Sequence, residues 1–206
     1  MEDVRDLKES QLDAMREVAN IGAGHAATAL SQMTNRTIMI TVPRVKIKPL
    51  EDAGDMLGPP DQVVASVLMH MMGDLTGRAM LLFPEPAALI LCDYLFRRER
   101  GTTTAFGEME QSSLKEAGNI LASAYLNALS DFMGMMLLPS VPSLVVDQAG
   151  AVLTTAYLNF GHDRDYVFCV ETSFRVEGAS EPLRGHFLLL PDTPSLRAIF
   201  DAIRLH

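Results

Sequence analysis

The chain has 206 residues, of which 48% are hydrophobic and 21% charged, and its formal net charge at pH 7 is −9. This composition is typical of a folded globular protein, and no apolar run approaches the roughly 18 residues of a membrane-spanning helix. An acidic chain without a basic cluster argues against nucleic acid and anionic membranes as partners and favours a partner with a basic patch. The charged first residues lack an apolar signal core, so we expect a cytoplasmic protein.

The first half of the chain predicts two helices separated by strands. Over residues 8–34, apolar residues recur every three or four positions, which indicates a long amphipathic helix. Residues 86–96 begin with proline and predict a short helix, while residues 51–61 are rich in Gly and Pro and predict a loop. Three segments have the patterning of strands: 37–48, 63–71 and 78–83. We expect the last two to form a hairpin.

The second half predicts the same order of elements. A long helix is expected over residues 107–133, and a final helix begins near Pro194. Residues 149–159 are inserted relative to the first half and predict a short helix capped by Asp147. The expected strand regions are 135–146, 166–176 and 184–190. The polar residues 97–104 predict the linker between the halves.

Self-similarity at a fixed offset indicates that the chain is internally duplicated. The segment 17–21 (Glu-Val-Ala-Asn-Ile) returns 99 positions later as the segment 116–120 (Glu-Ala-Gly-Asn-Ile). The pair Val42-Pro43 returns at the same offset as Val141-Pro142. A duplicated order of elements implies an architecture with a pseudo-two-fold axis.

The fold class follows from these elements. Helices grouped on one face of an antiparallel sheet make an α+β two-layer fold. We predict that the long motif helices pack on an antiparallel sheet of about six strands. Residues 1–206 then form a single domain made of two repeats, residues 1–100 and residues 101–206.

The sequence carries none of the familiar catalytic or metal-binding signatures. It has no glycine-rich phosphate loop and no G-x-S-x-G elbow, and its five histidines are not spaced as zinc ligands. Cys92 and Cys169 lie in apolar runs, so we interpret them as reduced core cysteines. Any activity must come from other residues.

The duplicated Glu and Asn residues are the strongest functional signal. Residues three apart share a helix face, so Glu17 lies beside Asn20 and Glu116 beside Asn119. Asn is a poor residue for a helix interior, because its side chain competes for backbone hydrogen bonds. A solvated helix face, or packing between the two helices, are structural explanations that stay open beside a functional one. We expect the motif helices side by side, with all four side chains exposed on one outer surface.

The motif resembles the CheC family of chemotaxis phosphatases. The similarity rests on residues 17–29, on residues 116–120 and on the following segment 128–134, and it covers nearly the whole chain. Two motif copies in about two hundred residues fit the CheC type rather than the single-site CheX or the larger FliY. Two residues depart from the pattern, because His25 stands where the resemblance implies Asn and Ser123 where it implies Gly.

The resemblance implies a hydrolase that removes phosphate from the phosphorylated aspartate of CheY, the response-regulator receiver of chemotaxis. Phosphoryl transfer has a loose transition state, so an Asn amide that holds water in line is sufficient chemistry for Asn20 and Asn119. We assign Glu17 and Glu116 to pairing with a lysine of the receiver, with a general-base role as the alternative. We expect no cofactor or metal on this chain, because the receiver supplies its own Mg²⁺.

Two other functions remain as alternatives. The same helix faces could bind the phosphorylated receiver without hydrolysis, as an adaptor that acts mainly through the deamidase CheD, a second partner that the resemblance implies. A purely structural duplicated domain would not contact a receiver at all. Phosphate release by substoichiometric protein separates the enzyme from the adaptor.

Overall fold

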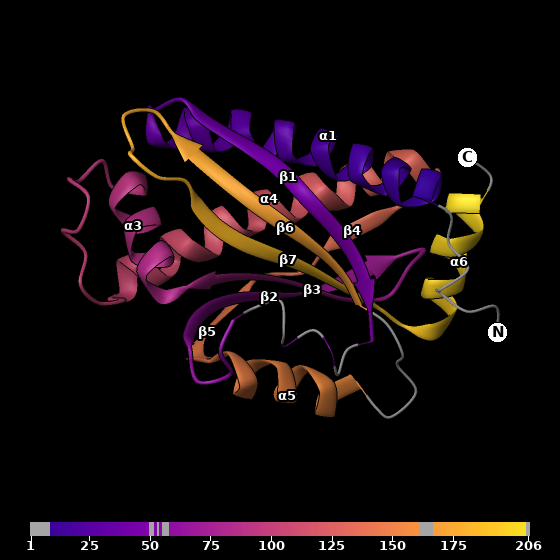
Figure 1. The fold of residues 1–206 in the computed structure, drawn as a ribbon. Helices are drawn as coiled ribbons and strands as arrows, with labels where there is room; N and C mark the ends of the chain where they lie inside the picture. Colours follow the sequence, from indigo (N-terminus) through magenta and orange to yellow (C-terminus); the bar gives the residue numbers. More distant parts are fainter. Residues whose placement is uncertain (1–8, 50–51, 53, 55–57, 161–166, 205–206) are drawn as a thin grey trace.

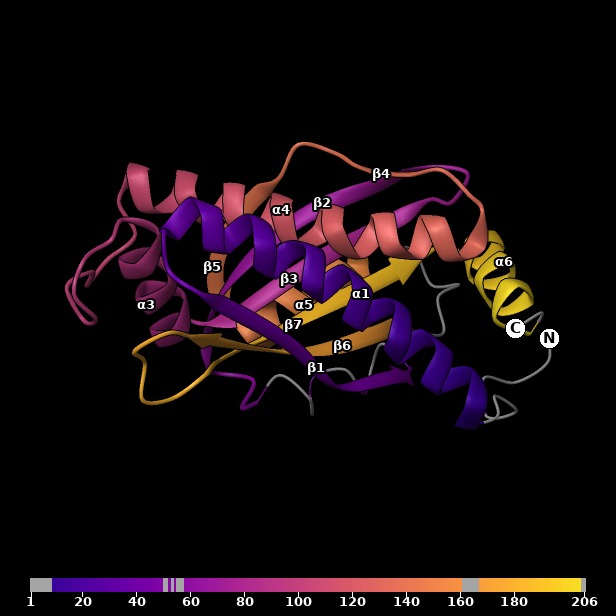
Figure 2. The same cartoon turned by 90° about the horizontal axis from the view of Figure 1, so that it is seen from above.

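Five helices lie against one twisted antiparallel sheet in the computed structural model, which describes residues 9–49, 52, 54, 58–160 and 167–204 (Figure 1). The two long helices, α1 and α4, run side by side over one face of the sheet (Figure 2). The α+β class and the arrangement of long helices on an antiparallel sheet are therefore confirmed.

The helices match the predicted segments closely. Their bounds are α1 Glu9–Thr34, α3 Glu85–Leu95, α4 Glu108–Met133, α5 Ala149–Phe160 and α6 Thr193–Arg204. The apolar periodicity places their ends within two residues, because each helix buries one stripe of side chains and exposes the other.

The sheet has seven strands in the part of the chain that the structure describes, where about six were predicted. The bounds are β1 Ile38–Lys48, β2 Val63–Gly73, β3 Gly77–Pro84, β4 Leu137–Pro139, β5 Ser143–Gln148, β6 Val167–Val176 and β7 Leu183–Pro191. The difference arises in the expected strand 135–146, which is interrupted at residues 140–142 and forms both β4 and β5. The strand order is β1-β6-β7-β3-β2-β4, and β5 also pairs with β2.

The first and second halves of the chain exchange strands. β1 pairs along its length with β6, whereas β4 and β5 pair with β2. The hairpins β2–β3 and β6–β7 are joined through β3 and β7 at the centre of the sheet. Neither half therefore completes a sheet with its own strands alone.

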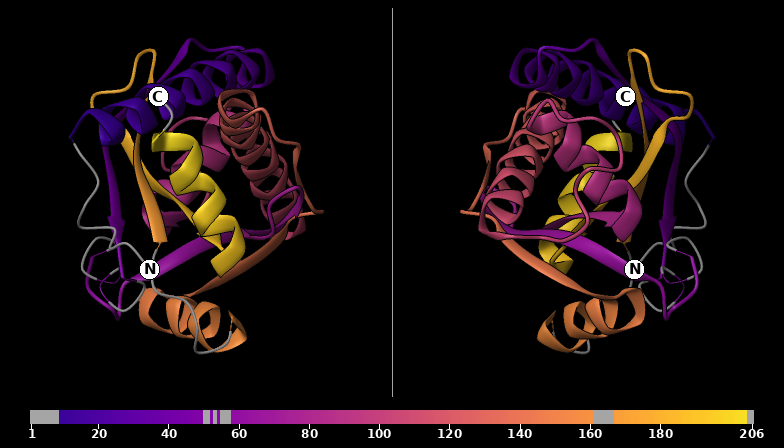
Figure 3. Two further views of the ribbon diagram at one scale, coloured as in Figure 1. Left: turned by 90° about the vertical axis from the view of Figure 1, so that its right-hand side faces the viewer. Right: turned by 90° about the vertical axis from the view of Figure 1, so that its left-hand side faces the viewer.

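The main core fills the space between the sheet and the layer made by α1, α3, α4 and α6. Residues Ala23, Ala26 and Leu30 of α1 and residues Leu121 and Leu126 of α4 are fully buried there. The opposite face of the sheet carries a smaller apolar cluster covered by α5. Figure 3 shows α5 on the other side of the sheet from α1 and α4.

Two glycines set how closely the motif helices approach their neighbours. A Cβ atom added at Gly22 would lie 2.9 Å from Tyr125 Cα and 3.0 Å from the Ala124 carbonyl oxygen, so α1 meets the backbone of α4 at this point. A Cβ atom at Gly118 would lie 2.7 Å from a methyl group of Val67, which places α4 directly on β2. These close contacts require glycine, which has no side chain, at both positions.

A buried carboxylate organises the linker between α3 and α4. The two oxygens of Asp93 accept hydrogen bonds from the backbone N–H groups of Gly101 and Thr103, each at 2.7 Å. Arg98 in the same linker forms an ion pair of 2.8 Å with Glu110 in the first turn of α4. The linker therefore has a defined conformation that fixes where α4 begins.

The N-terminus of α5 differs from the prediction. Asp147 accepts a hydrogen bond from Gln148 N–H, outside the helix, and does not cap it. The first N–H groups of α5 instead donate to backbone carbonyls, Ala149 to Gln62 at 2.8 Å and Gly150 to Pro60 at 2.9 Å. Residues 51, 53 and 55–57 of the expected loop 51–61 lie outside the described residues, and residues 58–61 are in neither a helix nor a strand. None of the described helices combines the length and apolarity needed to cross a bilayer.

Candidate functional site

The predicted site residues lie on two adjacent helices. Glu17 and Asn20 project from α1 and Glu116 and Asn119 from α4, each pair enclosing two buried residues that face the core. Glu17, Asn20 and Glu116 are exposed, while Asn119 is half-buried rather than exposed as expected. The two helices that carry these pairs run side by side over one face of the sheet (Figure 2).

Asn20 is held by the strand that follows its helix. The Val42 backbone N–H of β1 donates a hydrogen bond of 3.2 Å to Asn20 Oδ1. An N–H group can only donate, so it selects the carboxamide oxygen. One oxygen lone pair and both N–H donors of the Asn20 amide then remain for other partners.

Asn119 lies in a different environment. Within the described residues its side chain has no hydrogen-bond partner. The duplicated residue that corresponds to Val42 is Val141, which is 89% exposed where Val42 is 4% exposed. Val141 lies in the break between β4 and β5, directly after Ser140, whose N–H donates to the His70 carbonyl of β2. The two sites therefore share residue types, but only the Asn20 side chain is held by a hydrogen bond from the described residues.

The two glutamates form no ion pair among the residues that the structure describes. Arg16, next to Glu17, forms its ion pair of 2.9 Å with Asp13 instead. Within the described residues neither Glu17 nor Glu116 is part of an ion pair. Two exposed carboxylates without a cation suit a partner that brings a basic group.

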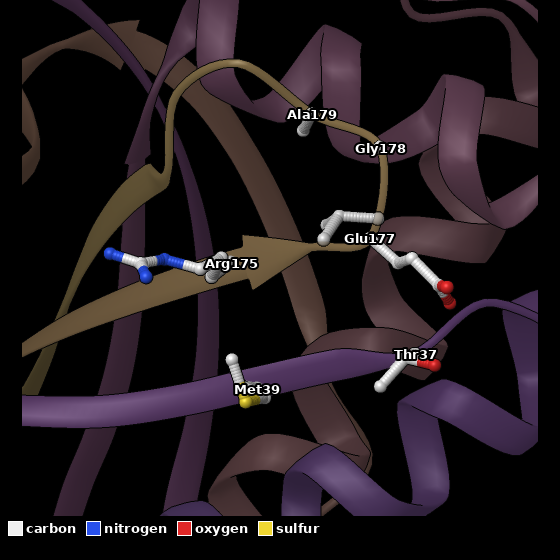
Figure 4. A pocket seen from close by; sticks show the side chains of 7 residues that line it. Thr37, Met39, Arg175, Glu177, Gly178 and Ala179 are labelled. Carbon is white, nitrogen blue, oxygen red and sulfur yellow. The ribbon is translucent and has the colours of Figure 1, made fainter.

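A pocket lined in part by charged residues lies elsewhere, where β1 begins and β6 ends (Figure 4). This pocket of about 360 Å³ is lined by Thr37, Met39, Arg175, Val176, Glu177, Gly178 and Ala179, and none of the four predicted site residues contributes to it. The hydroxyl and backbone N–H of Thr37 donate to the Glu177 carboxylate and hold its pKa below the usual value. These bonds tie the ends of the two strands together.

The two cysteines are not placed to take part in chemistry. Both cysteines are buried and unpaired, and burial raises the pKa of Cys92 and of Cys169 to about 12, so their thiols are inert at neutral pH. No three His, Cys, Asp or Glu residues gather as metal ligands among the residues described.

Comparison with known proteins identifies the family. The model of the CheC-like family matches residues 11–47 and 109–146. The CheY-P phosphatase CheC of Bacillus subtilis is 37% identical over 199 residues, which cover 96% of this chain and 95% of that protein. The chain belongs to the CheC-like family. Both Glu-Asn pairs of this CheC-like protein, and both Val-Pro pairs, fall inside the matched segments.

Other relatives of the CheC-like chain agree with this assignment. The flagellar motor switch phosphatase FliY of Bacillus subtilis is 30% identical over 129 residues, which are 62% of this chain and 33% of FliY. The crystal structure of FliY from Thermotoga maritima has a TM-score of 0.80 at 20% identity and covers 97% of this chain and 98% of that one. The similarity to the Thermotoga maritima structure shows a shared fold.

One residue of the site is absent from the sequence-based prediction. The repeated Val-Pro pair indicates the duplication, but its pattern does not reveal that Val42 contacts Asn20. The available signal is proline inside a strand, which marks a break in the hydrogen-bond ladder and frees a neighbouring N–H group.

Proposed function

We propose that this CheC-like protein is a phosphatase that hydrolyses the aspartyl phosphate of the response regulator CheY. The observation that carries the proposal is the exposed Glu17–Asn20 pair on α1 with its copy, Glu116 and Asn119, on α4. The 37% identity to a relative named as a CheY-P phosphatase, over nearly the full length of both chains, supports it.

In this proposal each Asn orients the attacking water. The amide offers an oxygen acceptor and N–H donors, which hold water in line with the scissile P–O bond without removing a proton outright. A loose phosphoryl-transfer transition state makes little demand on base strength, so an amide such as that of Asn20 is sufficient without a strong base. The Mg²⁺ that the reaction uses belongs to the receiver, and this chain supplies no cofactor.

The glutamates have a different task. A carboxylate beside a phosphoryl group repels it, whereas a carboxylate that pairs with a lysine of the receiver fixes how the two proteins dock. Glu17 and Glu116 are exposed and form no ion pair with the described residues, which favours docking, and the net charge of −9 acts in the same direction. A general-base role for these residues is the alternative.

The test is phosphate release from phosphorylated CheY by substoichiometric protein. Asn20→Ala and Asn119→Ala each remove one site, and each site should lose roughly ten- to a thousand-fold in turnover with little change in receiver affinity. The double variant should approach the unassisted rate of hydrolysis. Asn127→Ala is the matched control, because Asn127 is an exposed asparagine of α4 outside the motif.

The result for the double variant decides the mechanism. Wild-type turnover in Asn20→Ala/Asn119→Ala would exclude water positioning by these amides. Glu17→Ala and Glu116→Ala should weaken receiver binding as well as turnover, since the lysine pairing exists before the reaction. A fall in turnover at unchanged affinity would favour the general-base role instead.

The competing function is a non-catalytic adaptor that binds phosphorylated receiver and acts mainly through the deamidase CheD. The same mixture separates the two, because an adaptor protects the phosphate and an enzyme releases it. Binding of CheD is measured independently by titration with the wild-type chain. CheD binding without phosphate release would replace the phosphatase by the adaptor.

A further inference from the structure

The Val42–Asn20 contact depends on an irregularity in β1. Thr41 pairs with Ser173 and Arg44 with Glu171, so two residues of β1 face the single residue Thr172 of β6. This is a β-bulge, and one of its two residues is Pro43, which has no N–H group. The bulge interrupts the ladder and allows the Val42 N–H to turn to α1.

We propose that the Val42 backbone N–H is a positioning group for the reaction at Asn20, an inference that rests on the proposed phosphatase function. The 3.2 Å hydrogen bond holds the carboxamide oxygen against β1 and fixes which side of the amide group faces the receiver. The free lone pair and the N–H donors of Asn20 are then oriented before the substrate arrives. Preorganised dipoles of this kind act chiefly in the transition state.

The surroundings hold the bulge in place from both strands. The Val42 side chain is anchored in the core, and Thr172, which faces the bulge, is fully buried. The Thr172 hydroxyl shares a hydrogen bond of 3.0 Å with the Tyr125 hydroxyl of α4. The donor that orients Asn20 is therefore supported by packing from both motif helices.

The second site lacks this support. Val141 is exposed between β4 and β5, and its carbonyl oxygen accepts from the Ser140 hydroxyl beside it at 3.2 Å. The Asn119 amide has no partner among the described residues, so it must be ordered when the receiver docks. The Asn20 amide is thus oriented by its own chain, whereas the Asn119 amide becomes oriented only in the complex with the receiver.

Amide hydrogen exchange tests the geometry without any activity measurement. Asn20→Ala should accelerate exchange of the Val42 N–H at least about fivefold, because its side-chain acceptor is removed, while Asn20→Asp keeps an oxygen acceptor and retains the protection. Val45, in the same strand, is the internal control, and Asn119→Ala should leave exchange at Val141 unchanged. Equal exchange of Val42 in the wild type and Asn20→Ala would overturn the proposal.

Turnover tests the role. An amide-to-ester replacement at Val42 removes the N–H and keeps the side chain, and it is made in Asn119→Ala so that only the first site is measured. The kcat should fall about fivefold at unchanged KM, the rate equivalent of ~1 kcal/mol. The matched replacement at Val141 in Asn20→Ala should leave kcat unchanged. Circular dichroism confirms that each ester variant is folded.

The outcomes separate this inference from the function on which it rests. Unchanged kcat in the Val42 ester, or a rise in KM alone, would overturn the positioning role while the phosphatase remains. Wild-type turnover in the double Asn variant would instead refute the function, and the exchange experiment would still decide whether Val42 orients Asn20.

Discussion

Replacing Gly22 by alanine should destabilise the protein, although alanine is the better helix residue. The gain in helix propensity is about 0.5–1 kcal/mol. The new Cβ would lie 2.9 Å from Tyr125 Cα and 3.0 Å from the Ala124 carbonyl oxygen, and these backbone atoms of α4 cannot rotate away. Separating two packed helices to relieve such contacts costs ~1–3 kcal/mol. We therefore expect a net loss of up to about 2.5 kcal/mol.

Gly24 provides the matched control two residues further along α1. It is exposed, and a Cβ added there meets nothing within 4 Å outside its own helix turn. Gly24→Ala should therefore stabilise the protein by about 0.5–1 kcal/mol. Because the propensity term is common to both changes, the difference of ~1–3 kcal/mol between them isolates the contact with α4.

Urea unfolding of the three proteins measures this difference. The midpoint should rise in Gly24→Ala and fall in Gly22→Ala, and thermal unfolding should separate the variants by about 2–4 °C per kcal/mol. Equal stability of the two variants, within about 0.5 kcal/mol, would refute the close approach of α1 and α4 at Gly22.

Three further predictions follow from buried groups. Asp93→Asn points an amide N–H₂ at backbone N–H donors of the linker and should lower the free energy of unfolding in urea by about 1–3 kcal/mol. The control, Asp201→Asn, changes an exposed carboxylate and should cost almost nothing. Equal unfolding midpoints would contradict the role of Asp93 in the linker. Burial raises the pKa of Tyr125 from 10.0 to about 12, so ultraviolet titration should show Tyr125 ionising late. The contribution of this group to stability is present below pH 10 and should be lost as the pH rises toward 12. Cys92 and Cys169 should resist alkylation at pH 8 in the native protein and react in denaturant; rapid native modification would show that they are accessible.

The helices and the hairpins could be predicted from the sequence because their determinants are local. The apolar stripe of α1 and the proline near the start of α3 specify where each helix lies, and both pairs of Glu and Asn residues fall on the opposite face of their helices. The predicted cap of α5 was wrong for the opposite reason, because the first N–H groups of this helix donate to the carbonyls of Gln62 and Pro60, far away in the sequence.

The pairing of strands and the support of the two sites could not be predicted. Val42-Pro43 and Val141-Pro142 are identical in sequence, yet Val42 is in the core and Val141 is in solvent. The difference arises because β1 continues through its bulge along β6, whereas the chain between β4 and β5 leaves the sheet. The hydrophobic pattern of a strand does not show which distant strand it pairs with.

The exchange of strands between the halves has a consequence for synthesis of the protein. β1 ends at Lys48 and its partner β6 begins at Val167, so about 120 residues must be translated before β1 can find the strand that completes it. Until then the emerging chain carries an apolar, extended segment with both edges open, the kind of segment that chaperones on the ribosome bind and that otherwise aggregates. Translation of the last hairpin, rather than of the first repeat, is thus the step that commits the chain to its native sheet.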